Sequence, residues 1–147
     1  METANAPGQF LPFLDAAEES ALMTAATSKS FDRNQVVFDQ DLPLRAIYVI
    51  EDGAVRIERQ DREKVVPLAI LTAGEFFGEM SFVDGAPTSA KAVADEPTRL
   101  RIIDEAIVDS MVKADPAFAG RLYRSIAAIL VDRLRLTSMH LTLDRWG

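Results

Sequence analysis

Cysteine is absent from this chain of 147 residues, and histidine occurs once, at position 140. The lack of cysteine excludes disulfides, thiolate zinc sites and a cysteine nucleophile. A single histidine excludes metal centres built from several imidazoles. Glu79 and Asp84 could suggest an acid–base pair, but no nucleophile or metal ligand accompanies them. We therefore expect a protein that is not an enzyme and holds no cofactor or metal.

Long apolar runs and an excess of positive charge are also missing. No stretch approaches the roughly 18 apolar residues of a membrane span, and the N-terminus lacks the basic and apolar segments of a secretory signal. The formal net charge of −7 opposes attraction to nucleic acid or anionic lipid. We expect a cytoplasmic protein with no nucleic-acid or membrane partner.

A group of arginines near the C-terminus is the exception to this acidic balance. They recur along an expected helix, so a solvated helix face is favoured over a nucleic-acid patch. The group consists of Arg121, Arg124, Arg133, Arg135 and Arg145.

Both ends of the chain have helical patterns, and the length fits a single domain spanning residues 1–147. Within an N-terminal helical segment, 1–30, residues 10–28 are expected to form a short amphipathic helix. Asp15 is a suitable N-cap for it, and Glu18 lies three residues later, as in a capping box.

The middle of the chain, residues 31–104, has the pattern of short strands. Runs of β-branched and aromatic residues alternate with turn clusters, which predicts an antiparallel β jelly roll with flanking helices. Pro67 within one run suits an edge strand or a bulge. The expected strands are 36–38, 46–50, 54–57, 65–71 and 100–103.

Residues 105–147 return to a helical period. A short helix is expected from Glu105 to Ala114, and Asp115-Pro116 has the pattern of a second helix start. That second helix would run for roughly 28 residues, or about 42 Å.

Two apolar stripes are expected on this long helix. If one stripe packs on the barrel, the other is available for a second subunit, which predicts a homodimer. A single wide apolar face packed on its own barrel is the alternative. The first stripe is Tyr123, Ala127, Leu130, Leu134, Thr137 and Leu141, and the second is Ile126, Ile129, Leu136 and Leu143, interrupted by Arg133 and His140.

Residues 77–94 contain the most informative motif. Gly78 and Gly85 bracket a segment able to form one helical turn, and glycine permits the close backbone approach that a phosphate diester requires. The opening Phe77-Gly-Glu-Met-Ser81 and the close Pro87-Thr-Ser-Ala90 resemble the phosphate-binding cassette of cyclic-nucleotide-binding domains. The expected strands with Gly53, and the approach 72–79, are similar to the same family, of the bacterial catabolite activator protein type.

This resemblance implies a set of ligand contacts. Glu79 would accept hydrogen bonds from a ribose hydroxyl, and Thr88 takes the place of the arginine that neutralises the phosphate in the family. Lys91 is close to Thr88 in sequence and could be a substitute cation, but strand alternation directs its side chain away from that of Thr88. The cassette contacts implied within 77–91 are Phe77, Gly78, Glu79, Met80, Ser81, Thr88, Ser89 and Ala90.

The segment beginning at Arg133 resembles the dimer helix of the same proteins. Thr137 and Ser138 stand where a Thr-Ser pair meets the adenine edge of bound cyclic AMP, although small polar residues on a helix surface explain them equally well. The family implies a regulatory module that binds cyclic AMP or cyclic GMP and signals through its C-terminal helix. A degenerate domain that serves as an interaction or dimerisation scaffold is the alternative, motivated by Thr88.

Overall fold

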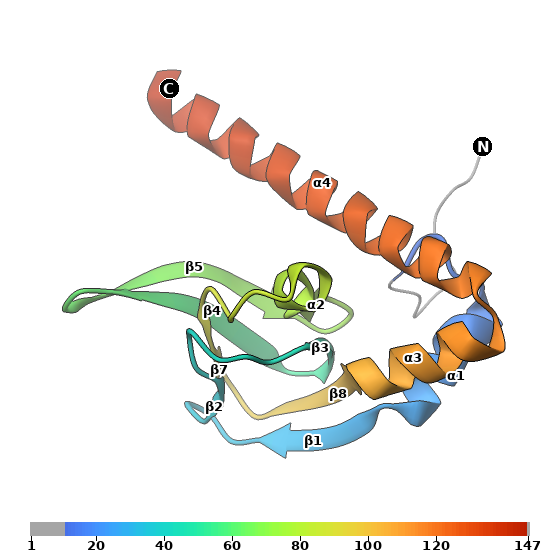
Figure 1. Cartoon of the computed structure of the whole chain (residues 1–147). Helices are drawn as coiled ribbons and strands as arrows, with labels where there is room; N and C mark the ends of the chain where they lie inside the picture. The colour runs from blue at the N-terminus through green and yellow to red at the C-terminus, as the bar shows by residue number, and fades with distance from the viewer. Residues whose placement is uncertain (1–10, 147) are drawn as a thin grey trace.

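The computed structural model describes the backbone of residues 11–146 and the side chains of residues 11–135. Helices flank a set of eight strands at both ends of the chain, and a further short helix interrupts the strands (Figure 1). The elements are α1 (Ala16–Ala25), β1 (Thr27–Phe31), β2 (Val36–Phe38), β3 (Ala46–Asp52), β4 (Ala54–Asp61), β5 (Lys64–Thr72), β6 (Phe76–Phe77), α2 (Glu79–Asp84), β7 (Lys91–Ala94), β8 (Thr98–Asp104), α3 (Glu105–Ala114) and α4 (Ala117–Trp146).

The strands form two antiparallel four-stranded sheets. One sheet has the order β1-β8-β3-β6, and the other has the order β2-β7-β4-β5. Strands that are distant in sequence become neighbours, as β1 and β8 do with Phe31 opposite Thr98. The predicted jelly roll with helices at both ends is therefore confirmed.

Strand β3 joins the two halves of the core because it is buried on both faces. Ile47 and Val49 point toward the helices, whereas Tyr48 and Ile50 point between the sheets. This follows from the alternation of side chains along a strand. A continuous apolar run from Ala46 to Ile50 is what a strand buried on both faces requires.

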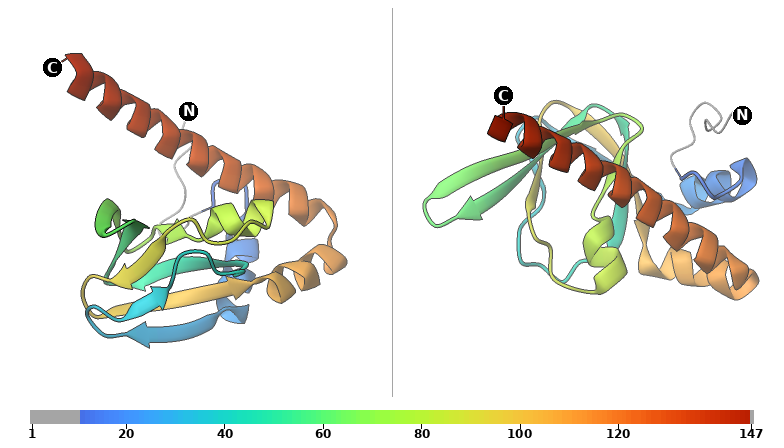
Figure 2. Two further views of the ribbon diagram at one scale, coloured as in Figure 1. Left: turned by 60° about the vertical axis from the view of Figure 1, so that its left-hand side comes forward. Right: turned by 90° about the horizontal axis from the view of Figure 1, so that it is seen from above.

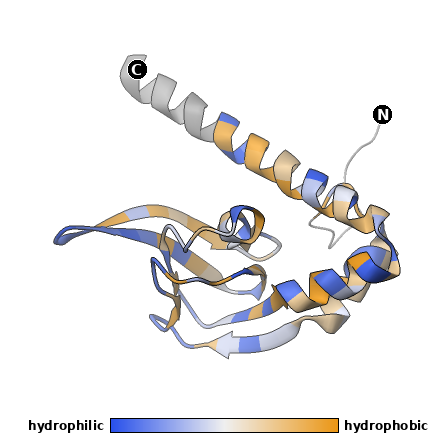
Figure 3. Ribbon diagram, in the orientation of Figure 1, coloured by the Kyte–Doolittle hydropathy of each residue, from blue (hydrophilic) through white to orange (hydrophobic). Residues whose placement is uncertain are grey.

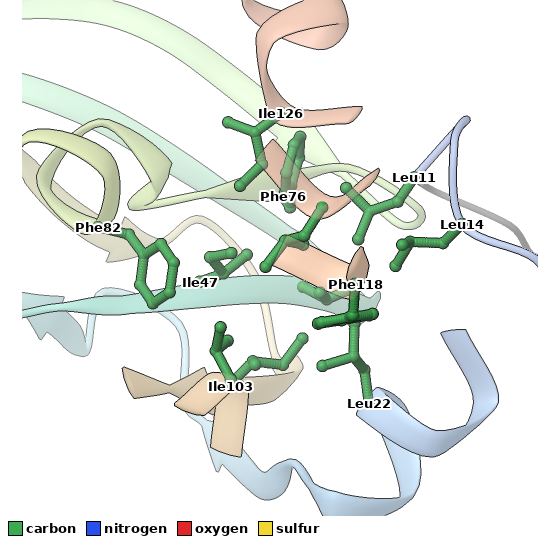
Figure 4. Packing of buried hydrophobic residues seen from close by; sticks show 12 residues of the cluster. Leu11, Leu14, Leu22, Ile47, Phe76, Phe82, Ile103, Phe118 and Ile126 are labelled. Atoms are coloured by element: carbon green, nitrogen blue, oxygen red, sulfur yellow. The ribbon is translucent and has the colours of Figure 1, made fainter. Parts of the chain in front are cut away.

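The first part of the core lies between the sheet and the helices. Phe118 and Ile126 of α4 meet Ile47 of β3, Phe76 of β6 and Ile103 of β8 (Figure 4). These side chains are almost fully buried. The start of α4 is thus held against the sheet by apolar contact, which fixes where the helix leaves the barrel.

The N-terminal helix is shorter than expected. Its capping box is present as predicted, since Asp15 accepts from the Glu18 amide and Glu18 accepts from the Asp15 amide. The helix ends at Ala25 rather than residue 28, because β1 begins at Thr27 and pairs with β8. Pairing with a distant strand overrides a local helical preference that the sequence pattern alone cannot weigh.

Strands β6 and β7 are also absent from the predicted set. β6 has two residues, Phe76–Phe77, and β7 has four, Lys91–Ala94, and they pair with β3 and with β2 and β4. β6 is too short to show a periodicity, and β7, Lys-Ala-Val-Ala, has a single β-branched residue, so neither has a strong strand pattern. Pro67 lies on the edge strand β5, beside an irregularity of register, as predicted.

The break between α3 and α4 is at the predicted position. α3 ends at Ala114, and the Asp115 carboxylate accepts from the Ala117 amide at the start of α4. α4 spans 30 residues and extends beyond the barrel (Figure 2). Over the described residues, no helix has the length and apolar character needed to cross a membrane.

The two stripes of α4 have different environments over the described side chains. Ile126 is buried and Ile129 packs on the core, so this stripe faces the barrel. Tyr123 and Leu134 of the other stripe are exposed, Leu134 to 67%. Leu130 between them is half-buried against the core.

A second exposed apolar surface lies on the hairpin formed by β4 and β5, which reaches out from the barrel (Figures 1 and 2). Strand β5 is largely hydrophobic in sequence but exposed along its length (Figure 3). Val65, Leu68 and Ile70 are each more than half exposed.

Candidate ligand-binding cavity

The predicted cassette forms a turn, a short helix and a loop. Gly78 precedes α2 with φ +85°, and Gly85 follows it with φ +72°, as a left-handed conformation at each end requires. A side chain at position 78 would meet the Ala46 carbonyl at 2.8 Å and the Tyr48 ring at 2.9 Å. Glycine at 78 therefore lets α2 approach β3 closely.

Beside this cassette is a cavity of about 210 Å³. All of the predicted cassette residues line it, and four apolar side chains from β2, β4 and β5 complete the wall together with Arg133 from α4. The lining is Phe38, Ile57, Ala69, Leu71, Phe77, Gly78, Glu79, Met80, Ser81, Thr88, Ser89, Ala90 and Arg133.

An aromatic stack supports one wall of this cavity. The rings of Phe77 and Tyr48 are stacked with centroids 5.1 Å apart, and Phe38 lies 5.2 Å from Tyr48. Such packing orders the apolar wall before any ligand arrives. Burial of Tyr48 in the same cluster raises the pKa of its hydroxyl.

Glu79 places a carboxylate in this largely apolar cavity. Its side chain is 6% exposed, and an Arg133 nitrogen lies 2.5 Å from Glu79 Oε1. Burial raises the pKa of Glu79, and the positive charge of Arg133 opposes that shift. An ionised Glu79 is an acceptor suited to hydroxyl groups.

Arg133 is the residue that the sequence prediction missed. It was assigned to a solvated helix face, and that assignment is wrong because its guanidinium reaches into the cavity. It bonds both Glu79 and the Phe76 carbonyl, and it lies over the Phe76 ring at 5.1 Å. Its interruption of an apolar stripe, seven residues after Ile126, was a signal that could have revealed it.

Two other arginines of the group also have partners. Arg121 pairs with Glu18 and Asp115, and Arg124 lies 4.0 Å from the centroid of the Phe13 ring. They therefore fasten α4 to the N-terminal part of the chain. Arg135 is exposed, as predicted for the whole group.

Thr88 contributes to the wall, but its hydroxyl has a structural role. It is 4% exposed, its Oγ1 accepts from the Leu42 amide at 2.9 Å, and it donates to the Asp39 carbonyl at 2.7 Å. Backbone hydrogen bonds from Thr88 to Leu42 and from Asp41 to Thr88 strengthen the same junction. Thr88 thus joins the cassette to the loop after β2.

Three further residues considered in the sequence analysis are Lys91, Thr137 and Ser138. Lys91 is directed out of the cavity toward Asp39, at 4.0 Å, in agreement with strand alternation. Thr137 and Ser138 lie on α4 beyond the last described side chain, so their predicted contacts fall outside the described residues. Across the described side chains, no group of three or more potential metal ligands occurs.

The sequence profile of the cyclic nucleotide-binding domain matches residues 28–115, which is more than half of the chain. The chain belongs to this family. The fold is thus that of a regulatory domain of the cyclic nucleotide-binding type, and the predicted family is confirmed.

Curated relatives support this membership. The chain is 34% identical over 118 residues to the cyclic AMP receptor protein of Thermus thermophilus, covering 77% of this chain and 51% of that protein. It is 30% identical over 115 residues to cyclic GMP-binding protein C of Dictyostelium discoideum, covering 78% of this chain and 4% of that protein. The chain therefore spans about half of the first relative and a small part of the second.

A solved structure extends the likeness to three dimensions. The crystal structure of the Thermus thermophilus catabolite activator protein matches with a TM-score of 0.74 and 29% identity, over 88% of this chain and 60% of that one. The shared part includes the mainly antiparallel sheets, the N-terminal helix and the long C-terminal helix.

Proposed function

We propose that this domain binds a cyclic nucleotide, cyclic AMP or cyclic GMP, in the cavity beside α2 and that binding is relayed through α4. The observation that carries the proposal is the joint lining of one cavity by the cassette and by Arg133 of α4. A ligand held there would touch the barrel and the helix at once.

The cavity has features that suit the two ends of a nucleotide. Glu79 offers a carboxylate for ribose hydroxyls, and Ser89 and Ala90 line the same cavity. The apolar side chains of Ile57, Ala69 and Leu71 offer a surface for a base. Named relatives that bind cyclic AMP and cyclic GMP favour the same ligand class.

The output of binding would be a change in the population of α4 positions. A ligand shifts such an equilibrium only if it binds one position more tightly than the other. Arg133 supplies that difference, because its contacts with Glu79 and Phe76 exist only when α4 is docked. Thr137 and Ser138 remain proposed contacts for the base.

We also propose that α4 pairs with a second copy of the chain. Tyr123, Val131 and Leu134 leave an apolar stripe exposed on one side of the helix. Sedimentation velocity should show a dimer that Leu134→Glu converts to a monomer. A wild-type chain that sediments as a monomer at the concentrations used for ligand titration contradicts this part of the proposal.

The second candidate is a domain that serves as a scaffold and leaves the cavity empty. Thr88 favours it, because a buried, fully hydrogen-bonded threonine provides no charge for a phosphate. The scaffold would retain the fold and the α4 interface.

Isothermal titration with cyclic AMP and with cyclic GMP separates the two. We expect binding to at least one of them with a Kd below roughly 100 µM, equivalent to more than about 5 kcal/mol, and a loss of about tenfold or more in Glu79→Gln. Glu75→Gln is the matched control, since Glu75 bonds Thr72 and is not part of the cavity lining. No heat with millimolar nucleotide would favour the scaffold.

A further inference from the structure

The cavity wall formed by the cassette carries no positive charge of its own. Thr88 is neutral, and its hydroxyl is engaged by Leu42 and Asp39. Lys91 is directed at Asp39 and does not line the cavity. A cyclic phosphodiester in this cavity would bring a negative charge close to the carboxylate of Glu79, which is unfavourable without a nearby cation.

Arg133 is the cationic residue among the described residues that line the cavity. Its guanidinium is held between Glu79 and the Phe76 carbonyl, and its side chain as a whole is about one-third exposed. Guanidinium groups suit phosphate because their planar N–H donors match two oxygens at once. The positive charge in the lining of the cavity therefore comes from Arg133 of α4 and not from the cassette.

We propose that Arg133 is the phosphate-neutralising residue of this domain, so that recognition of the ligand's charge depends on α4 being docked. This rests on the proposed binding of a cyclic nucleotide. Thr88 holds the cassette to the loop after β2, and Arg133 neutralises the phosphate, so each residue has one role.

Because the neutralising charge is on α4, the affinity for the ligand and the docking of α4 depend on each other. If α4 leaves the barrel, the phosphate loses its counter-charge, and Glu79 loses its ion-pair partner. A bound ligand conversely stabilises the docked helix by the same free energy, because coupling between two sites is reciprocal.

The test compares Arg133→Gln, Arg133→Lys and the control Arg135→Gln, which changes an exposed arginine on the same helix. By calorimetry with cyclic AMP or cyclic GMP, whichever binds the wild type, we expect Arg133→Gln to weaken binding about 10- to 100-fold. Arg133→Lys should lose less, because it keeps the charge, and Arg135→Gln should bind as the wild type does. Circular dichroism and thermal melting establish that each variant is folded.

A second measurement addresses charge directly by changing the ligand. The neutral methyl triester of the same cyclic nucleotide should bind the wild type at least about tenfold more weakly than the parent compound. Arg133→Gln, if folded, should bind the two compounds equally.

The outcomes are distinguishable. Equal binding of parent and triester by the wild type overturns the role of Arg133, as does full affinity in Arg133→Gln. Equal loss of both compounds in Arg133→Gln also overturns it, because Arg133 would then only brace Glu79. Failure of the wild type to bind either cyclic nucleotide overturns the proposed function itself.

Discussion

At the scale of single residues, two side chains of the cassette have different kinds of partner. Thr88 and Glu79 both line the cavity, but Thr88 bonds backbone groups, whereas Glu79 pairs with Arg133, which is 54 residues away in sequence. The sequence alone indicated that the cassette has a neutral residue at Thr88 and a carboxylate at Glu79. Their partners depend on tertiary contacts with no local signal.

The hydroxyl of Thr88 is expected to stabilise the fold. Thr88→Val keeps the shape but leaves the Leu42 amide and the Asp39 carbonyl without their partner, which should lower the free energy of unfolding by about 1–3 kcal/mol. Thr88→Ser keeps the hydroxyl and is the control. Urea unfolding measures both, and equal stability of the Val and Ser variants would refute the structural role. Thr88→Arg would place a cation at the position where the family has arginine, but it would also remove this hydroxyl and its two hydrogen bonds.

Glu79 should leave a signature in the dependence of stability on pH. Burial raises its pKa in the folded state above the ordinary value of 4.5, so proton binding favours the folded form. This stabilising contribution is complete below the ordinary pKa and is lost as pH rises through the raised pKa. Glutamine does not titrate, and Arg133 stays charged throughout.

Urea unfolding of the wild type and of Glu79→Gln at a series of pH values measures this contribution. The stability of the wild type relative to Glu79→Gln should fall as pH rises from about 4.5 and then level off. A difference that stays constant or rises over this window would show that the pKa of Glu79 is not raised.

At the scale of elements, the start of α4 is tied to the N-terminal segment as well as to the sheet. The Phe13 amide donates to the fully buried Ser125 hydroxyl at 2.8 Å, and Arg124 lies over the Phe13 ring. Arg121 pairs with Glu18 of α1. Movement of α4 at this end would therefore move α1.

Removing the Ser125 hydroxyl should loosen this connection. Ser125→Ala leaves the Phe13 amide without its acceptor and is expected to cost about 1–2 kcal/mol of stability. Hydrogen exchange should become faster in residues 11–25 and remain unchanged in β3 and β8. Ser110→Ala, on the exposed face of α3, is the control. Unchanged exchange in residues 11–25 would show that the connection is not energetically significant.

The elements also show which parts of the fold could be predicted from sequence. The capping box at Asp15, the start of α4 after Asp115 and the strand run from Ala46 to Ile50 have strong local patterns, and they are confirmed. The end of α1 and the strands β6 and β7 depend on pairing with distant strands and could not be placed. The position of Arg133 within an apolar stripe indicates that it faces the barrel, but the helical period does not identify Glu79 as its partner.

At the scale of the whole molecule, the proposed signal depends on the long helix α4. Arg133 of this helix lines the cavity, and its described part has exposed apolar side chains at Tyr123, Val131 and Leu134. Exposed apolar side chains on β5 form a second surface, on the hairpin that extends from the barrel (Figure 1). Domains of this family are matched within longer proteins, so the partner that receives the signal can be elsewhere in such a chain.

The central claim is that a cyclic nucleotide in the cavity holds α4 on the barrel. Hydrogen exchange along α4, measured with and without a saturating cyclic nucleotide, tests it directly. We predict slower exchange from Ile126 onward in the ligand-bound wild type and no change in Glu79→Gln at the same nucleotide concentration. Exchange of α4 that is identical with and without ligand, when calorimetry shows the wild-type site to be occupied, would contradict the account.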